Sequence, residues 1–263
     1  MATMTTLKSK AQKNKQKVVK NMQIYQKTSY NDINYTEYRD GGVENVLILH
    51  DLTSSANNKE INELVDNLVK QKISAIVVDL PYHGNDNSQG NFDYETALKK
   101  LQSFFWLPNL HRPQTHDMAI FAFGLSSIFA LNCYKNLDSY NGTIFLYSPD
   151  MEWDNALLKL INKHGYKRKD IENNGVEING ERKINLDSKL FYTLKQNLIK
   201  EKIDTPNIYV FYPENETKSK IKTNEVYLKK CRNVTVKHLS GENPFDEIAE
   251  IMINHLESDY VTY

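Results

Sequence analysis

Residues 118–131 constrain the fold most, because an apolar run, a sharp turn and the start of a helix follow one another there. The uninterrupted apolar run 118–123 is typical of a strand buried on both faces in a parallel sheet. The small residues 124–127 form the turn, and the apolar residues after them predict a helix over 128–135. A serine at such a turn, here Ser126, is lifted above the sheet and leaves the next backbone N–H free to bind an oxyanion.

Apolar runs and helical patterns alternate along the rest of the chain. Strands are predicted at 34–39, 46–49, 73–78, 143–147, 207–212 and 234–236, and helices at 59–70, 94–105 and 245–256. Strands and helices in this alternation predict a mostly parallel sheet with helices on both faces. The long segment before the fifth of these strands is interpreted as an insertion, about 151–205, and its Asn-Gly turn predicts a hairpin over 175–184.

Length and composition indicate one large globular α/β domain. The chain has 263 residues, of which 40% are hydrophobic and 25% are charged. It lacks an apolar run long enough to span a membrane. Its two cysteines, Cys133 and Cys231, do not make a disulfide framework, so we expect reduced thiols in an intracellular, cytoplasmic-type compartment.

Charge is unevenly distributed along the chain. Residues 1–31 contain seven lysines and no acidic residue. With seven of the 33 basic residues there, 26 remain against 33 acidic residues in 32–263, a formal charge of −7. This pattern predicts a basic N-terminal arm in front of a domain formed by 32–263. We expect the arm to bind a protein with an acidic surface, such as another subunit or a cytoskeletal polymer like tubulin. Nucleic acid such as RNA is an open but unsupported alternative, because the basic arm lacks interleaved aromatic residues of the kind that stack on bases.

Three further segments accompany the turn at Gly124-Leu125-Ser126. Residues 49–52, Leu-His-Asp-Leu, resemble the His-Gly segment that completes an oxyanion hole, and 79–84 resemble an Asp-x-Pro-Gly-x-Gly turn. The insertion falls where a cap would lie. With these four features in this order, the chain resembles the α/β-hydrolase superfamily from about residue 35 to residue 256. The resemblance implies the α/β-hydrolase fold, with a mostly parallel sheet, helices on both faces and a cap-type insertion.

The resemblance also implies a catalytic triad in the chain order serine, acid, histidine. Ser126 matches the nucleophile. Glu216 best matches the acid that follows the strand 207–212, with Glu214 as the second choice. The backbone N–H groups implied for an oxyanion hole are those of Leu52 and Ser127.

Several positions depart from the superfamily pattern. Glu242 or Asn243 stands in the place of the histidine, and neither can shuttle a proton at neutral pH as imidazole does. His238, just upstream, is the candidate base if the chain is active. Asp51 replaces a glycine and puts a carboxylate where negative charge would develop, opposite to what oxyanion stabilisation needs. Ile128 replaces the last glycine of the elbow.

Two functions therefore compete. In the first, the triad is impaired and the domain is a binding or structural subunit of a larger assembly. In the second, the chain is an active serine hydrolase that acts on a small ester, thioester or amide. The sequence has no Walker or dinucleotide glycine pattern and no Cys/His cluster with metal-ligand spacing, so we expect neither a cofactor nor a metal.

Overall fold

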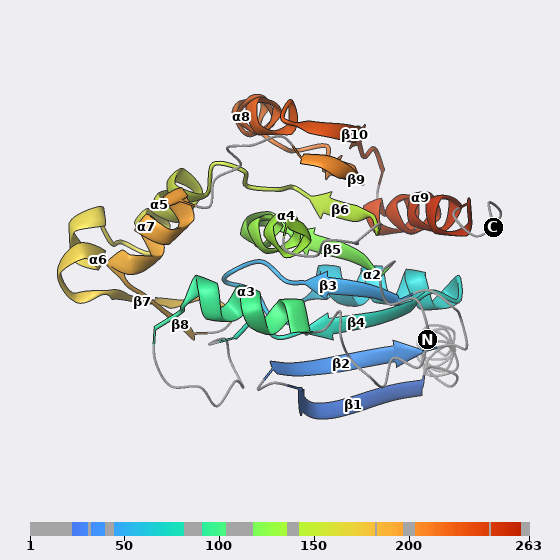
Figure 1. The fold of residues 1–263 in the computed structure, drawn as a ribbon, viewed down its shortest axis with the longest axis horizontal. Coiled ribbons are helices and arrows are strands. Elements are labelled where there is room, and N and C mark those ends of the chain that lie inside the picture. The colour runs from blue at the N-terminus through green and yellow to red at the C-terminus, as the bar shows by residue number, and fades with distance from the viewer. Residues whose placement is uncertain are drawn as a thin grey trace, which may run out of the picture.

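The structure is a computed structural model, and it describes residues 23–30, 33–39, 45–81, 91–103, 118–135, 142–181, 183–196, 203–241 and 243–258. An eight-stranded sheet forms its centre, with the strand order β1-β2-β4-β3-β5-β6-β9-β10. The first two strands, β1 (Gln23–Tyr30) and β2 (Ile33–Arg39), form an antiparallel hairpin, and β2 runs antiparallel to β4 (Figure 1). All other neighbouring strands of this sheet are parallel.

The parallel strands are β3 (Asn45–Leu49), β4 (Ser74–Val78), β5 (Ala119–Phe123), β6 (Ile144–Tyr147), β9 (Ile203–Tyr212) and β10 (Cys231–His238). Every residue of β4, β5 and β6 is buried, as their apolar sequences predict. The ends of β3, β5 and β6 therefore meet at one edge of the sheet, where the residues that follow each strand can form a site.

Helices cover both faces of the sheet (Figure 1). One face packs on α2 (Lys59–Lys70) and α9 (Pro244–Ser258), and the other packs on α3 (Tyr94–Ser103), α4 (Ser127–Lys135) and α8 (Lys218–Leu228). The α2 helix buries a stripe of apolar residues with helical spacing, and the Asn58 side chain caps its first turn by accepting from the Glu60 N–H at 2.8 Å. The helix thus starts immediately after the loop that follows β3.

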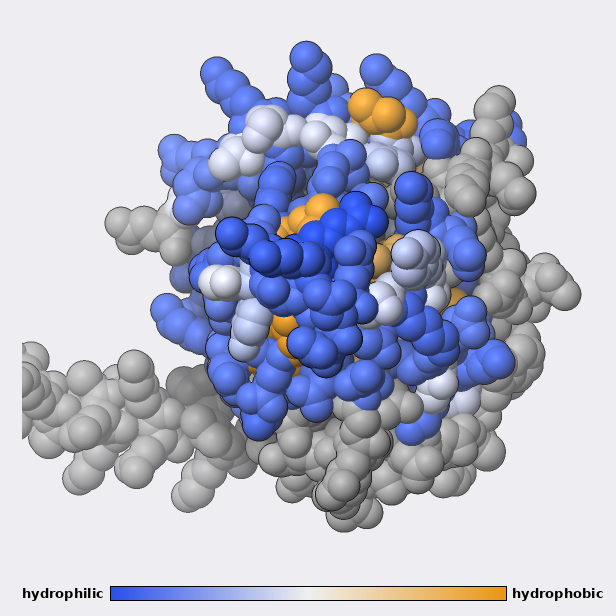
Figure 2. Space-filling model, turned by 90° about the vertical axis from the view of Figure 1, so that its left-hand side faces the viewer, coloured by the Kyte–Doolittle hydropathy of each residue, from blue (hydrophilic) through white to orange (hydrophobic). Residues whose placement is uncertain are grey.

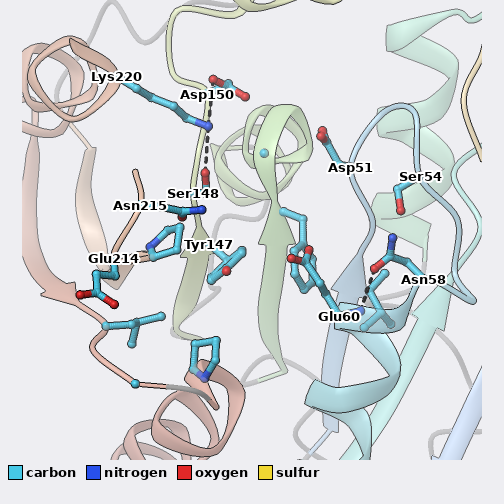
Figure 3. Close-up of a pocket in the computed structure, with 17 residues that line it drawn as sticks. Asp51, Ser54, Asn58, Glu60, Tyr147, Ser148, Asp150, Glu214, Asn215 and Lys220 are labelled. Carbon is cyan, nitrogen blue, oxygen red and sulfur yellow. Dashed lines mark hydrogen bonds and ion pairs between the residues drawn. The ribbon is translucent and has the colours of Figure 1, made fainter. Parts of the chain in front are cut away.

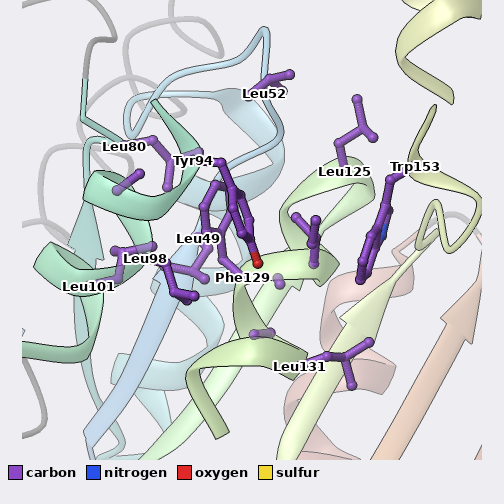
Figure 4. Packing of buried hydrophobic residues seen from close by; sticks show 14 of the residues in the cluster. Leu49, Leu52, Leu80, Tyr94, Leu98, Leu101, Leu125, Phe129, Leu131 and Trp153 are labelled. Carbon is purple, nitrogen blue, oxygen red and sulfur yellow. The ribbon is translucent and has the colours of Figure 1, made fainter. Parts of the chain in front are cut away.

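The second face contains the larger apolar core (Figure 4). Phe129 of α4 lies at its centre, with the Tyr94 ring 5.0 Å away and the Phe92 ring 6.0 Å away between centroids. Trp153, which begins α5, is fully buried in the same core. The insertion is therefore joined to the domain by a shared hydrophobic core.

The insertion between β6 and β9 has its own secondary structure. It consists of α5 (Trp153–Lys163), α6 (Arg168–Asn174), the antiparallel hairpin β7 (Val176–Asn179) and β8 (Lys183–Leu186), and α7 (Ser188–Gln196). It lies beyond the carboxyl ends of the parallel strands (Figure 1). Figure 2 shows that the face of the molecule on this side is mostly hydrophilic, with scattered hydrophobic residues.

The predicted fold class is confirmed, and the predicted strands and helices recur, although β9 and β10 are longer than the predicted 207–212 and 234–236. The segment 1–31 is an exception, because β1 occupies residues 23–30 and belongs to the sheet. The predicted boundary between arm and domain thus falls inside the β1–β2 hairpin. Residues 1–22, which carry most of the lysines, lie outside the described residues.

The lengths and sequences of the described helices also bear on membrane insertion. In the described ranges, no helix has both the length and the apolar character needed to cross a bilayer.

Candidate functional site

The turn after β5 begins at Gly124, which has a φ of +50°. Residues Gly124–Ser126 form a single 3-10 turn, η4, that leads into α4. A left-handed φ is strained for residues with a side chain, and a Cβ atom at Gly124 would lie only 2.7–2.8 Å from the three carboxyl atoms of Asp51. The first position of the turn is therefore restricted to glycine by its backbone and by its neighbour.

Asp51 places its carboxylate in the space beside Gly124. Its Oδ1 atom accepts hydrogen bonds from the backbone N–H of Leu52 and from that of Leu125, each at 2.8 Å. Burial raises the pKa of this carboxyl group, and the two N–H bonds offset part of that rise. Two N–H groups that converge on one oxygen form the geometry of an oxyanion hole, and in this chain a carboxylate of the protein itself occupies it.

Ser126 is the last residue of this turn and is fully buried. Its hydroxyl donates to the backbone carbonyl of His50. The His50 ring is also fixed, because its Nε2 accepts the Leu80 N–H at 3.0 Å and its Nδ1 lies 2.7 Å from the Asp51 carbonyl oxygen. The N–H of Ser127 bonds to carbonyls inside the turn, so the N–H that faces the same oxygen as Leu52 belongs to Leu125 and not to Ser127. The donor N–H thus lies two residues before the predicted Ser127, because Gly124 is the first residue of the turn.

Glu216 belongs to a compact charged cluster at the ends of β6 and β9. Its carboxylate accepts from the Ser148 hydroxyl and lies 3.6 Å from the Lys220 Nζ. The same Nζ lies 3.2 Å from an Asp150 carboxylate oxygen and donates to Ser148 Oγ at 2.9 Å. Ser148 has a φ of 45°, a backbone conformation that is uncommon for residues other than glycine.

The structure does not bring the three residues of the predicted triad together. The His238 side chain is exposed and its ring stacks on Tyr212, with 5.6 Å between centroids. Within the described ranges, no hydrogen bond or ion pair joins Ser126, Glu216 and His238 to one another. The Asn243 side chain donates to Asp246 at 2.9 Å, in the first turn of α9, and Glu242 lies outside the described residues.

A cavity of about 730 Å³ opens where these strand ends meet, which is within the usual range for small-molecule sites (Figure 3). Its walls combine carboxylates, one lysine, small polar residues and aromatic rings. The residues that line it are Asp51, Ser54, Asn58, Glu60, Ile61, Phe123, Gly124, Tyr147, Ser148, Asp150, Pro213, Glu214, Asn215, Lys220, Leu239, Gly241 and Pro244. Glu214 therefore faces the cavity, whereas Ser126, Glu216 and His238 do not line it.

The hairpin of the insertion holds one wall of this cavity. The Glu181 carboxylate accepts from the hydroxyls of Ser54 and Ser55 at 3.2 and 3.1 Å, and from the Asn58 amide at 2.6 Å. The Glu181 backbone N–H donates to the Thr53 carbonyl at 3.1 Å. A single glutamate of the insertion thus fixes both the loop after β3 and the start of α2.

Sequence reasoning missed two central residues of this site. Gly124 has no functional group that would identify it in a sequence. The prediction therefore placed the nucleophile position at Ser126, two residues after Gly124. The signal was present in the spacing Ala122-x-Gly124-x-Ser126, where small residues flank Gly124 at the distances that a nucleophile elbow requires. Tyr147 was read only as the end of a buried strand, although its position at the strand end places it in the cavity wall.

Comparison with known proteins supports the same fold. No family model and no curated protein sequence matches the chain. A dienelactone hydrolase from Anabaena variabilis aligns with a TM-score of 0.56 and 12% identity, covering 89% of this chain and 96% of its own. Mouse alpha/beta hydrolase domain-containing protein 10 gives 0.59 and 10% over 91% and 100%, and a Pyrococcus furiosus esterase gives 0.59 and 11% over 90% of each chain. The chain therefore has the α/β-hydrolase fold, as predicted.

Proposed function

We propose that this chain is a binding subunit with the α/β-hydrolase fold, which holds a small ligand in its cavity and does not hydrolyse it through a serine nucleophile. One observation carries the proposal: Asp51 Oδ1 accepts both the Leu52 and the Leu125 N–H at 2.8 Å. Acyl transfer requires these donors to be free for the oxygen of the substrate. A carboxylate at this position both occupies the donors and repels a developing negative charge.

The residue at the start of the turn supports the same interpretation. Gly124 follows β5 directly and lines the cavity, but it offers no side chain to a substrate. The nearest serine along the turn, Ser126, is fully buried and bonded to a carbonyl oxygen. A hydroxyl without an imidazole or other base at hydrogen-bond distance is a weak nucleophile.

Labelling with a fluorophosphonate probe tests this proposal. Because the oxyanion hole is filled and no base among the described residues is hydrogen-bonded to the Ser126 hydroxyl, the folded protein should show no rapid stoichiometric labelling. An esterase of the same fold, labelled in parallel, controls for probe quality. Rapid modification that disappears in Ser126→Ala would refute the proposal and favour the active hydrolase.

The second candidate is that active hydrolase, with Ser126, Glu216 and His238 as its triad. It is favoured by the names of the structural neighbours, which are hydrolases and esterases. A variant of this candidate uses Ser148, which faces the cavity with a left-handed backbone and bonds Glu216 and Lys220. Peptide mapping of any labelled protein separates the two serines, and either label refutes the binding-only role.

A further inference from the structure

Acidic side chains outnumber basic ones in the lining of the cavity, where Asp51, Glu60, Asp150 and Glu214 face a single lysine, Lys220. On one wall, Lys220 lies between Asp150 and Glu216 at 3.2 and 3.6 Å, so its positive charge is already neutralised. Asp51 and Glu60 lie on the opposite wall (Figure 3). Within the part of the chain that the structure describes, neither makes an ion pair with a lysine or arginine.

The two carboxylates of the second wall are held in an unfavourable environment. Burial raises the pKa of Asp51, and the carboxylate of Asp150 adds to the rise. Glu60 is an exposed residue at the cavity rim, where desolvation by the surrounding atoms, followed by the charges of Glu63, Asp51 and Glu181, raises its pKa. A cation between them would favour the ionised form of both groups.

Tyr147 provides an independent sign of a ligand. The residue is only 8% exposed, and its hydroxyl makes no hydrogen bond within the described residues although it lines the cavity. Burial, followed by the charges of Glu60 and Glu216, raises the pKa of Tyr147 to about 12, so the phenol remains a donor at neutral pH. The hydroxyl oxygen is open to the cavity, so an acceptor atom of a ligand can take the place of water there.

The aromatic rings beside this hydroxyl suit a positive charge. The Phe123 and Tyr147 ring centroids are 5.4 Å apart, and Phe245 packs behind Tyr147 at 5.2 Å. Both Phe123 and Tyr147 line the cavity. An ammonium or guanidinium group near such faces gains a cation–π attraction of about 0.5–2 kcal/mol.

Size and spacing indicate an organic cation and not a metal ion. In the described ranges, no three carboxylate, histidine or cysteine side chains come close enough together to hold a metal ion. The cavity of about 730 Å³ instead has room for a molecule with several functional groups.

We infer that the cavity binds a small organic cation, with the cationic group beside Asp51 and Glu60 and an acceptor atom on the Tyr147 hydroxyl. This inference rests on the proposed binding function and names its ligand class. The ammonium or guanidinium group replaces the missing counter-ion of the second wall. The rings of Phe123 and Tyr147 lie beside this cationic group, and the rest of the molecule extends toward the wall around Lys220.

A matched ligand series tests the inference by calorimetry on the full chain at neutral pH and low salt. The probes are phenylethanolamine, phenylethylene glycol and mandelate, which share the ring and hydroxyl but carry an ammonium, a neutral hydroxyl and a carboxylate. We expect the amine to bind about tenfold more tightly than the glycol, and mandelate to bind most weakly. Equal binding of all three, tighter binding of mandelate, or no detectable binding of the amine at millimolar concentration would overturn the inference.

Two variants in α2 test whether the cationic group lies beside Glu60. Glu60→Gln removes the charge from the cavity rim and should weaken amine binding about tenfold while leaving the glycol unchanged. Glu63→Gln on the same helix is the control, since Glu63 pairs with Lys59 at 3.4 Å and does not line the cavity. Equal loss in both variants would refute the assigned position of the cation. If the protein binds the amine and is also labelled by fluorophosphonate, only the binding-only role is refuted. If the protein is not labelled and does not bind the amine, only the ligand class is refuted.

Discussion

Replacement of Asp51 should separate its role as a hydrogen-bond acceptor from its cost as a buried charge. Asp51→Ala removes the acceptor of the Leu52 and Leu125 N–H groups, and both of these residues are buried. A buried donor left without a partner costs about 1–3 kcal/mol. Since the cavity lets water reach one side of this site, we expect Asp51→Ala to lower the free energy of unfolding by about 2–4 kcal/mol.

Asp51→Asn should behave differently, because its amide oxygen can still accept both N–H groups and carries no charge. The pKa of Asp51 is raised in the folded state above its ordinary value of 3.8. Ionisation is therefore less favourable in the folded protein than in the unfolded chain, and it destabilises the native state as pH rises from about 4 through the folded-state pKa. We expect Asp51→Asn to be at least as stable as the natural protein at pH 7, and its advantage to vanish below pH 3.8.

Urea unfolding at several pH values measures both effects. Near-UV circular dichroism at pH 7 first establishes that each variant has native packing. The reasoning fails if Asp51→Ala and Asp51→Asn are equally stable, since the two N–H bonds would then contribute nothing. It also fails if the difference between Asp51→Asn and the natural protein is the same at pH 3.5 and pH 7.

Two further changes test the turn and the N-terminal segment. Gly124→Ala should destabilise the protein by at least about 1 kcal/mol through its left-handed backbone. The 2.7 Å approach of the new Cβ atom to Asp51 should add a further cost, which should disappear in the Asp51→Ala background. Additive changes in the free energy of unfolding would contradict this contact. Deletion of residues 1–22 removes six of the seven N-terminal lysines and leaves β1 intact, so the domain should keep its unfolding midpoint but lose salt-sensitive cosedimentation with polymerised tubulin. Unchanged cosedimentation would place any such interface on the domain itself.

The buried part of the fold could be predicted from the sequence because its strands are uninterrupted apolar runs. The helix α2 was predicted with the observed bounds, since its apolar stripe and the Asn58 cap act locally. The strands at the two edges of the sheet, β1 and β10, were harder to predict. In β1, the polar sequence Gln-Ile-Tyr-Gln-Lys-Thr-Ser-Tyr looked like a continuation of the lysine-rich segment, and only pairing with β2 makes it a strand. The strand β10 extends beyond the predicted 234–236 for the same reason, because backbone pairing with β9 continues through polar residues.

The site was predicted less well than the fold. Asp51 was recognised as unfavourable to an oxyanion, but its bonds to two N–H groups depend on a contact between residues 51 and 125 that sequence spacing does not reveal. The register of the turn was also misjudged, because a serine is conspicuous in a sequence and a glycine with a left-handed φ is not. Glu181 lies in the middle of the insertion, and nothing local indicates that it reaches Ser54, Ser55 and Asn58.

The hydrogen bonds of Glu181 also have a kinetic meaning. They join residues separated by 123 to 127 positions in the chain, among the long-range contacts that raise contact order and form late in folding. The loop after β3 can adopt its final shape only after the insertion has folded and docked. A nascent chain released before the hairpin is complete would lack these bonds, and it would also lack the cavity residues between Pro213 and Pro244. The proposed ligand site would therefore be complete only after these bonds have formed, and it would be lost when the hairpin opens.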